Sequence, residues 1–386
     1  MADGLTYVEA VTLSIINVLA LLGNTSLYYV VLKKPTMRTR TNWFILNLAA
    51  ADLLVSVFNM PLTTYTILEG RWVLDERMCT VTGFSNILSF IASVMSLAMI
   101  SIARYHKVVK WKSYSKYFTG RRCLIYIACV WFLSTSLAIP PLIGWARYSY
   151  IAGNSFCFVD WPSSISYTVF MIAICLFGPL ITMIYCYWNI WKTTKESTAT
   201  LTSHSRSGTL SKVEVSLNDI QANIRADQSL TGAKPDEKNG SGNPVLVRVS
   251  AFDQFENRSS FSDNEPESEY STHASEVNKS ASKSARKRLK ALKARASHDM
   301  RLTRTLIIVV VVFAICWTPF AVTMVVKVIL DKPIPRAVDF GTLLLGYANS
   351  ACNVVIYVIM GKQFRQAFRE AFGLRKLRDL CRKGES

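Results

Sequence analysis

The sequence predicts an all-α membrane protein, a seven-transmembrane helix bundle with a short amphipathic eighth helix. Two observations indicate this fold class. Of the 386 residues, 51% are hydrophobic and 18% are charged, a balance too apolar for most soluble domains. The apolar residues are gathered in seven runs of about 20 residues, the length that a helix needs to cross the hydrocarbon layer. Lipid offers the backbone no hydrogen bonds, so each run is expected to be helical.

The expected spans carry almost no formal charge. Asp52 lies deep in the second and Asp339 near the edge of the last. The runs also lack the polar stripe that a soluble core helix shows at a 3.6-residue period. The spans are expected at residues 11–32, 43–68, 80–103, 123–146, 164–191, 305–326 and 337–360.

The flanks of the spans indicate the orientation, because short cytoplasmic loops are enriched in Lys and Arg. The segment after the first span carries Lys33, Lys34, Arg38 and Arg40, whereas residues 1–10 have no basic residue. We therefore expect a multi-pass protein of the plasma membrane with its N-terminus outside. The net charge of +18 is then explained by flanks that lie beside anionic membrane lipid, and no nucleic-acid partner is expected.

The remaining segments complete the expected organisation. Residues 193–300 are rich in Ser, Thr, Asn and acidic residues, so they cannot bury enough apolar surface to fold alone. The last part of this loop, 284–295, is basic and made of helix formers, and either extends the sixth helix or remains a solvated tract. The expected parts are an extracellular N-terminus (1–10), spans one to five (11–192), a disordered cytoplasmic third loop (193–300), spans six and seven (301–360), and an amphipathic helix with the cytoplasmic tail (361–386).

The segment after the seventh span places three aromatic side chains on one helical face. Phe364, Phe368 and Phe372 stand four residues apart, with charged residues around the other side. This spacing is typical of a short helix lying in the membrane interface. Cys381 follows among basic residues, where it is either palmitoylated or a free cytosolic thiol.

Two of the nine cysteines differ from the rest. Most lie inside spans, where a buried thiol usually serves as a small apolar side chain. Cys79 stands at the outer start of the third span and Cys157 in the outer loop after the fourth, both on the oxidising side. We expect a disulfide between them.

A carboxylate in the middle of a span is costly, so Asp52 is a candidate functional residue. Polar residues at matching depth on other spans are available as partners. Together they could coordinate a sodium ion through oxygen ligands, or form a hydrogen-bonded cluster without a metal. The candidate partners are Asn24, Ser93, Asn349 and Asn353.

Two prolines interrupt otherwise continuous spans. Pro179 and Pro319 each remove a helical hydrogen bond and clash with the preceding turn, so each is expected to kink its helix. Trp317 stands two residues before Pro319, and Phe313 lies about one turn earlier. Bulky side chains are therefore expected at a pivot in the sixth helix.

Several motifs occur in a fixed order along the chain. They are Gly23 and Asn24 in the first span, Leu48 to Asp52 in the second, Trp72 in the first outer loop, Cys79 with Arg104 and Tyr105 in the third span, Trp131 in the fourth, Pro179 and Tyr187 in the fifth, Cys316 to Pro319 in the sixth, and Asn353 with Tyr357 in the seventh. The set resembles the rhodopsin-like, class A, G-protein-coupled receptors across all seven spans. Residues 144–148 and 362–365 resemble opsins, and the loops around spans two to four resemble melatonin receptors.

The resemblance implies a receptor, without enzymatic activity, that passes an extracellular signal to a heterotrimeric G protein by outward movement of helix six. Arrestin and receptor kinases are implied as further partners. The matching positions for ligand contacts, which plain packing residues would also occupy, are Asn86, Phe90, Trp317, Phe320 and Tyr347. The matching positions for the activation switch are Arg104, Tyr105, Tyr187, Asp299, Phe313, Trp317, Pro319 and Tyr357.

Four positions depart from the family pattern. Tyr347 stands where opsins carry the lysine that binds retinal, which excludes covalent retinal there and leaves non-covalent retinal in a photosensor as the alternative function. Amine receptors hold the ligand's ammonium with an aspartate where this chain has Asn86. Ala103 replaces the acidic residue before Arg104, and Val354 replaces the proline after Asn353. Asp299 is therefore the expected resting partner of Arg104.

Other functional classes lack their signatures. A transporter would usually show inverted repeats or broken helices around charges at the membrane midplane. An intramembrane enzyme would need a second catalytic group beside Asp52, and the four histidines all fall on the cytoplasmic side.

Overall fold

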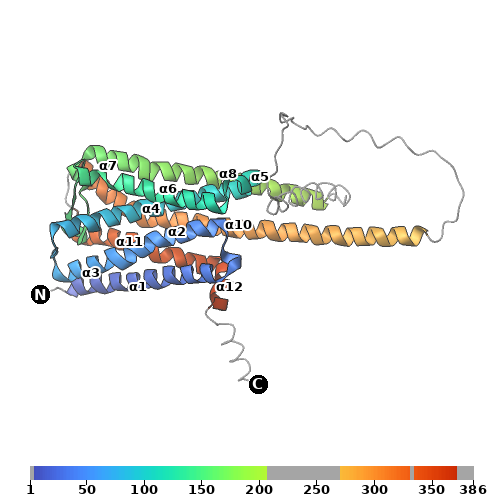
Figure 1. Ribbon diagram of the computed structural model, residues 1–386, viewed down its shortest axis with the longest axis horizontal. Helices are drawn as coiled ribbons and strands as arrows, with labels where there is room; N and C mark the ends of the chain where they lie inside the picture. Colours follow the sequence, from blue (N-terminus) through green and yellow to red (C-terminus); the bar gives the residue numbers. More distant parts are fainter. Residues whose placement is uncertain (1–3, 207–269, 331–333, 372–386) are drawn as a thin grey trace, which may run out of the picture. The chain divides into compact units, whose positions relative to one another are not determined.

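The computed structural model describes residues 4–206, 270–330 and 334–371 (Figure 1). Seven helices in this part of the chain are long and apolar enough to cross a membrane, which confirms the predicted bundle. The spans are Gly4–Lys33, Arg40–Glu69, Glu76–Val108, Gly120–Ile143, Ile165–Glu196, Met300–Leu330 and Arg336–Met360.

The elements in chain order are α1 (Gly4–Lys33), η1 (Pro35–Met37), α2 (Arg40–Leu54), η2 (Val55–Asn59), α3 (Met60–Glu69), α4 (Glu76–Val108), α5 (Trp111–Tyr117), α6 (Gly120–Ala138), η3 (Pro140–Ile143), β1 (Tyr148–Ile151), η4 (Ala152–Asn154), β2 (Phe156–Val159), η5 (Trp161–Ser163), α7 (Ile165–Met171), η6 (Ile172–Phe177), α8 (Gly178–Arg206), α10 (Tyr270–Leu330), α11 (Arg336–Met360) and α12 (Lys362–Ala371). Two of them, η2 and η6, are π-helical segments inside a span.

The chain divides into two compact units. The first, residues 1–198 with 297–386, contains the helix bundle. The second, residues 199–296, contains the end of α8 and the first part of α10. Within residues 193–300, where a disordered loop is expected, α8 continues to Arg206 and α10 begins at Tyr270. The expected helical extension at 284–295 is present in α10.

Several helices begin at a side chain that accepts a hydrogen bond from the first turn. Thr39 caps α2, Asp75 caps α4, Thr119 caps α6 and Ser164 caps α7. Each cap satisfies a backbone N–H that has no partner within its helix. The spans are therefore delimited by local chemistry as well as by hydrophobic length.

Helix α1 begins at Gly4, seven residues earlier than predicted. Its first turns contain an ion pair that hydropathy does not show: the Glu9 carboxylate accepts a hydrogen bond from Arg336 at 2.9 Å. Glu9 is buried against the start of α11. The segment expected to be an extracellular N-terminus is thus largely part of the first helix.

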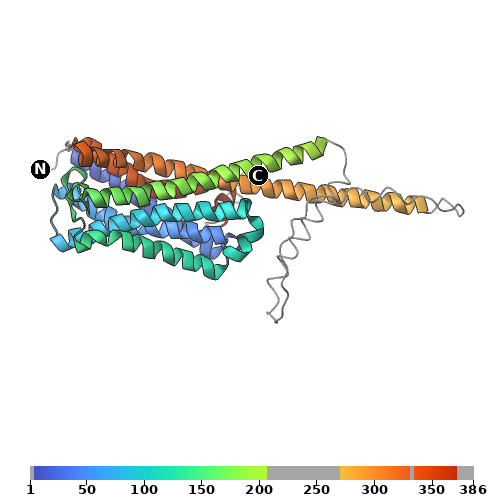
Figure 2. The same ribbon diagram turned by 90° about the horizontal axis from the view of Figure 1, so that it is seen from above.

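Helix α4 is the most enclosed span, with 72% of its apolar window buried. Figures 1 and 2 show it running between the other helices of the bundle, nearly along the same direction. Its small side chains, Ser89, Ala92 and Ser96 among them, are fully buried and let the neighbouring helices approach closely. The hydroxyls of Ser89 and Ser96 donate to the backbone one turn earlier, so their burial leaves no free donor.

The amphipathic helix α12 packs against the bundle. The Phe364 ring is buried and stacks on Tyr357 with ring centroids 5.4 Å apart. Lys34 and Glu370 form an ion pair at 3.1 Å that links α12 to the turn after α1. The first residue of the predicted aromatic stripe, Phe364, therefore packs against the helix bundle. Phe372 and Cys381 lie outside the described residues.

A two-stranded hairpin covers the outer end of the bundle. Strands β1 and β2 are antiparallel, with Tyr150 opposite Cys157. A disulfide joins Cys79 to Cys157, as predicted, with Cα atoms 5.3 Å apart. The Tyr148 hydroxyl donates to the Ala138 carbonyl at 2.7 Å, and burial raises the pKa of this phenol, which therefore remains a donor. A Cβ at Gly83 would lie 2.7 Å from the Tyr148 ring, so only glycine fits there.

We predict that Cys79→Ser or Cys157→Ser strongly reduces the amount of the protein at the cell surface. The disulfide bridges a sequence separation of 78 residues. Such bonds typically contribute about 2–5 kcal/mol to folding. Surface staining of an epitope-tagged protein measures the effect, and Cys129→Ser, which removes an exposed free thiol, is the control. Wild-type surface levels in both disulfide variants would contradict the prediction.

Candidate functional site

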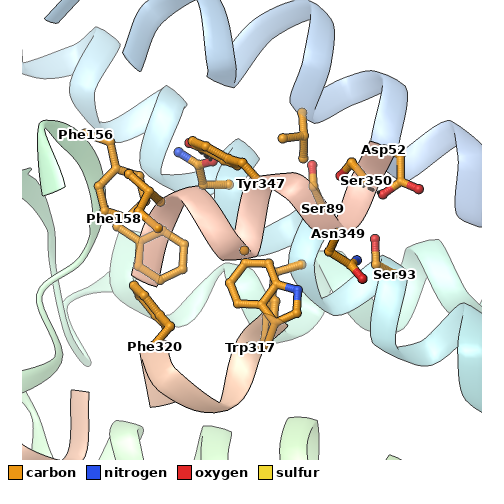
Figure 3. Close-up of a pocket in the computed structure, with 15 residues that line it drawn as sticks. Asp52, Ser89, Ser93, Phe156, Phe158, Trp317, Phe320, Tyr347, Asn349 and Ser350 are labelled. Atoms are coloured by element: carbon orange, nitrogen blue, oxygen red, sulfur yellow. Dashed lines mark hydrogen bonds between the residues drawn. The ribbon is translucent and has the colours of Figure 1, made fainter. Parts of the chain in front are cut away.

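The structure places the five predicted ligand-contact residues around one chamber inside the bundle (Figure 3). The chamber extends from the hairpin, where β2 contributes Phe156 and Phe158, to Asp52 on α2. Sequence reasoning missed these two phenylalanines, although both flank Cys157. The chamber is also lined by the five predicted residues: Asn86 and Phe90 on α4, Trp317 and Phe320 on α10, and Tyr347 on α11.

The Tyr347 hydroxyl lies between two polar side chains. It is 3.2 Å from Thr63 Oγ1 and donates to Asn86 Oδ1 at 3.3 Å. The Asn86 amide in turn donates to the Cys157 carbonyl at 3.1 Å. This chain of hydrogen bonds joins α3, α11, α4 and the hairpin. Asn86 therefore contributes a neutral amide that is already engaged with the loop.

Aromatic rings form a continuous column from the hairpin into the bundle. Phe158 contacts Phe320 edge to face at 5.8 Å, and Phe320 contacts Trp317 at 5.9 Å. The Trp317 ring centroid lies 4.6 Å from that of Phe90 and 6.2 Å from that of Phe313. The column includes residues of α10 on both sides of Pro319. It runs from the outer hairpin to Phe313, on the inner side of this proline.

Gly346 on α11 permits this packing. A Cβ at that position would approach Trp317 to 3.2 Å, a distance at which one of the two groups has to move. The indole therefore lies directly against the α11 backbone.

At the inner end of the chamber, Asp52 accepts two hydrogen bonds from α11. Ser350 Oγ donates to Oδ1 at 2.9 Å, and Asn353 Nδ2 donates to Oδ2 at 3.0 Å. Asn24 on α1 donates to the Ser350 carbonyl at 3.1 Å. The predicted partner Asn353 is thus in direct contact, and Asn24 acts through Ser350, a partner that sequence reasoning missed. Figure 3 shows the side chains of Asn349, Ser93 and Ser350 gathered beside the carboxylate.

The oxygen atoms around Asp52 fit a monovalent cation. The amide oxygens of Asn24, Asn349 and Asn353 are buried, and none has a hydrogen-bond partner within the described chain. With the Asp52 carboxylate and the Ser93 hydroxyl they provide hard oxygen ligands and one formal negative charge. Within the described residues no group of three or more His, Cys, Asp or Glu side chains could hold a metal, so a divalent site of that kind is absent there.

The predicted switch residues lie toward the inner end of the bundle. Arg104 is 2% exposed, Tyr105 is buried beside α8, and the Tyr357 ring lies under α12. Ala103 is fully buried, so an acidic residue there would be desolvated. Tyr187 on α8 is partly buried, and its hydroxyl is enclosed by protein. The side chain of Asp299, like Cys381, lies outside what the structure describes.

Comparisons with known proteins agree with this architecture. A family profile described as "7 transmembrane receptor (rhodopsin family)" matches residues 23–357. A 5-hydroxytryptamine receptor 1B of Vulpes vulpes is 27% identical over 367 residues, which cover 94% of this chain and 85% of the relative. A G-protein coupled receptor 161 of Danio rerio is 32% identical over 190 residues, covering 49% of this chain and 36% of the relative. The crystal structure of squid rhodopsin matches with a TM-score of 0.70 at 22% identity, over 97% of this chain and 87% of that chain, and this supports the fold.

We predict that sodium stabilises the solubilised protein through Asp52. Replacing choline chloride by NaCl at constant ionic strength should raise Tm by about 3 °C, because a ligand of the folded state shifts the unfolding equilibrium. Asp52→Asn should abolish this difference. Ser89→Ala is the matched control, since Ser89 lines the same chamber but donates to the Ser85 carbonyl. An unchanged sodium effect in Asp52→Asn would show that sodium acts at another site, and no sodium effect in the wild-type protein would show that the cluster is held by hydrogen bonds alone.

Proposed function

The chain belongs to the rhodopsin family of seven-transmembrane receptors, and we propose that it transmits an extracellular signal to a heterotrimeric G protein by outward movement of the inner half of the α10 membrane span, Met300–Leu330. Receptors of this family are multi-pass membrane proteins and not enzymes. In the proposed topology the N-terminus and the hairpin face outward, and the basic segments at the other end of the bundle face the cytoplasm. Arrestin and receptor kinases are proposed as further cytoplasmic partners.

The main support for this proposal is the aromatic column, whose α10 residues lie on both sides of Pro319. A ligand that alters the packing of Phe158, Phe320 or Trp317 changes the contacts that α10 makes on the two sides of Pro319. A proline inside a helix removes one backbone hydrogen bond, so the helix can pivot there at low cost. A ligand with different affinities for the two positions of the helix then shifts their populations.

The chamber gives no support for an amine ligand of the kind named in the 5-hydroxytryptamine receptor relatives. An ammonium group needs an anionic partner, and at the matching position this chain has Asn86, whose amide donates to the hairpin. Covalent retinal is likewise unsuited to the site, since a Schiff base requires a primary amine and Tyr347 is a phenol. The ligand pocket is therefore proposed to recognise neutral groups.

We propose that Asp299 holds Arg104 in the resting receptor. Because Ala103 carries no carboxylate, Arg104 lacks the adjacent acid that the family pattern provides. We expect an ion pair between these two residues to contribute about 1 kcal/mol. A shift of that size changes the ratio of active to inactive receptor by roughly five-fold.

Ligand-independent second-messenger assays for cAMP and calcium test the proposed function. Wild-type receptor should change basal signalling relative to mock-transfected cells. Asp299→Asn should amplify that change up to about five-fold. Arg104→Ala should abolish the change, because the same arginine is proposed to contact the G protein. Asp299→Glu keeps the charge and serves as the matched control. At equal surface expression, wild-type signalling from Asp299→Asn would rule out the latch, and full signalling from Arg104→Ala would rule out the proposed coupling.

A further inference from the structure

The hairpin is held over the outer end of the bundle by polar contacts with the helices. Arg336, at the start of α11, bonds to the Glu9 carboxylate on α1 at 2.9 Å and to the Ala152 carbonyl in η4 at 3.2 Å. The tip of the hairpin is thus joined to two helices by one side chain. Glu9 is buried, so this ion pair is more protected from solvent than an exposed surface pair.

A second ion pair lies beside the first. Asp339 on α11 bonds to Lys327 on α10 at 2.5 Å, and its carbonyl accepts a hydrogen bond from Asn154 at 2.8 Å. A Cβ at Gly153 would lie 2.5 Å from the Asp339 carboxylate, so the hairpin backbone sits directly on this residue. Together the two ion pairs hold the hairpin against α1, α10 and α11.

Little space remains in the central chamber, whereas a neighbouring cavity is large. The chamber has a volume of about 30 Å³, and the cavity, between η6 with α8 on one side and α10 on the other, has about 450 Å³. Cavities of about 300–1,000 Å³ accommodate small-molecule ligands. The two spaces share Phe90, Phe158, Trp317 and Phe320, so an occupant of the cavity contacts the aromatic column.

The lining of this cavity is mainly apolar and includes no carboxylate and no basic side chain. Its surface is formed by side chains such as Met171, Leu180, Val310, Ala321 and Met324. A charged ligand would lose its hydration there without gaining a partner. The cavity therefore selects an uncharged molecule.

The cavity reaches the face of the bundle that contacts lipid. Leu176, Val322 and Val325 line it and are 38%, 54% and 37% exposed. On the α8 side the lining comes from the π-helical segment η6, which contributes Ile172 and Leu176. π-Helical turns redirect side chains and occur frequently at functional sites.

One donor at the outer end of the cavity lacks an acceptor. Trp161 Nε1 is buried and has no hydrogen-bond partner in the described part of the chain. An unpaired buried donor is unfavourable, and a ligand oxygen would relieve this.

From these observations, and on the basis of the proposed receptor function, we infer that the ligand is an uncharged lipophilic molecule with a hydrogen-bond acceptor, which enters from the bilayer between η6 and α10. Its apolar body fills the cavity against Phe313 and Trp317, on the inner side of Pro319. Its acceptor oxygen accepts a hydrogen bond from the Trp161 indole, whose side chain must turn toward the cavity because Nε1 is enclosed by protein. Occupancy then changes the packing of α10 without opening the hairpin.

Binding is tested with purified receptor in phosphatidylcholine nanodiscs and a matched pair of fluorescent probes. Methyl cis-parinarate is uncharged and carries an ester oxygen, whereas cis-parinarate has the same chain with a carboxylate. Energy transfer from tryptophan to the polyene reports binding, and the component removed by excess methyl oleate is the specific part. The methyl ester should show saturable transfer, with an affinity at least about ten-fold higher than that of the acid.

Variants locate the binding. Ala321→Phe fills the cavity and Val322→Phe narrows its opening, so each should remove the saturable component. Ala128→Phe makes the same change as Ala321→Phe at an exposed position of α6 and should leave it unchanged. Trp161→Phe should weaken binding by roughly two- to ten-fold through loss of one hydrogen bond. The surface level of each variant establishes that it folds.

Saturable transfer that persists in both Ala321→Phe and Val322→Phe, or equal affinity for acid and ester, would overturn the inference. The binding assay contains no G protein, so its outcome is separate from that of the signalling assay. Specific binding without any basal signalling would support the cavity and count against the proposed coupling. Basal signalling with no saturable binding would leave the receptor function intact and reject this ligand class.

Discussion

The bundle is organised by one constraint: the hydrocarbon layer supplies no hydrogen bonds, so a polar group inside it must find its partner on another helix. Asp52 is the most demanding case, and it is satisfied by Ser350 and Asn353 of α11. Asn24 bonds to the Ser350 carbonyl, which brings α1 into the same arrangement. The position of α11 follows from these bonds. That position in turn places Tyr347 within reach of Asn86 and the hairpin.

The same constraint separates a fixed part of the protein from a part that can move. Hydrogen bonds link α1, α2 and α11 at the inner end of the chamber, and the disulfide with the Asn86 amide fixes the hairpin to α4. The contacts of α10 around Pro319 are made by aromatic rings, which can slide and repack at a lower free-energy cost than buried hydrogen bonds can be broken. Motion is therefore expected to concentrate in α10. The apolar cavity lies beside this helix, where an occupant has the greatest influence on it.

Much of this could be predicted from the sequence, because membrane spans and their interruptions are local properties. The seven helices, the Cys79–Cys157 bond and the importance of Asp52 follow from length, compartment and the cost of a buried charge. Contacts between distant segments could not be predicted in this way. The ion pair between Glu9 and Arg336 is an example, because nothing in the residues around Glu9 indicates its partner. Ser350 was missed because serine is common in helices, and Phe156 and Phe158 because their orientation depends on the hairpin.

The central claim is that α10 moves outward when the receptor engages its G protein. Distances measured by double electron–electron resonance test it most directly, with spin-labelled unnatural amino acids at Arg121 on α6 and Arg304 on α10, two exposed positions near the inner ends of their membrane spans. Receptor alone should give one main distance, and addition of nucleotide-free heterotrimeric G protein should produce a second, longer population. A distance distribution that stays the same with and without the G protein would contradict the account.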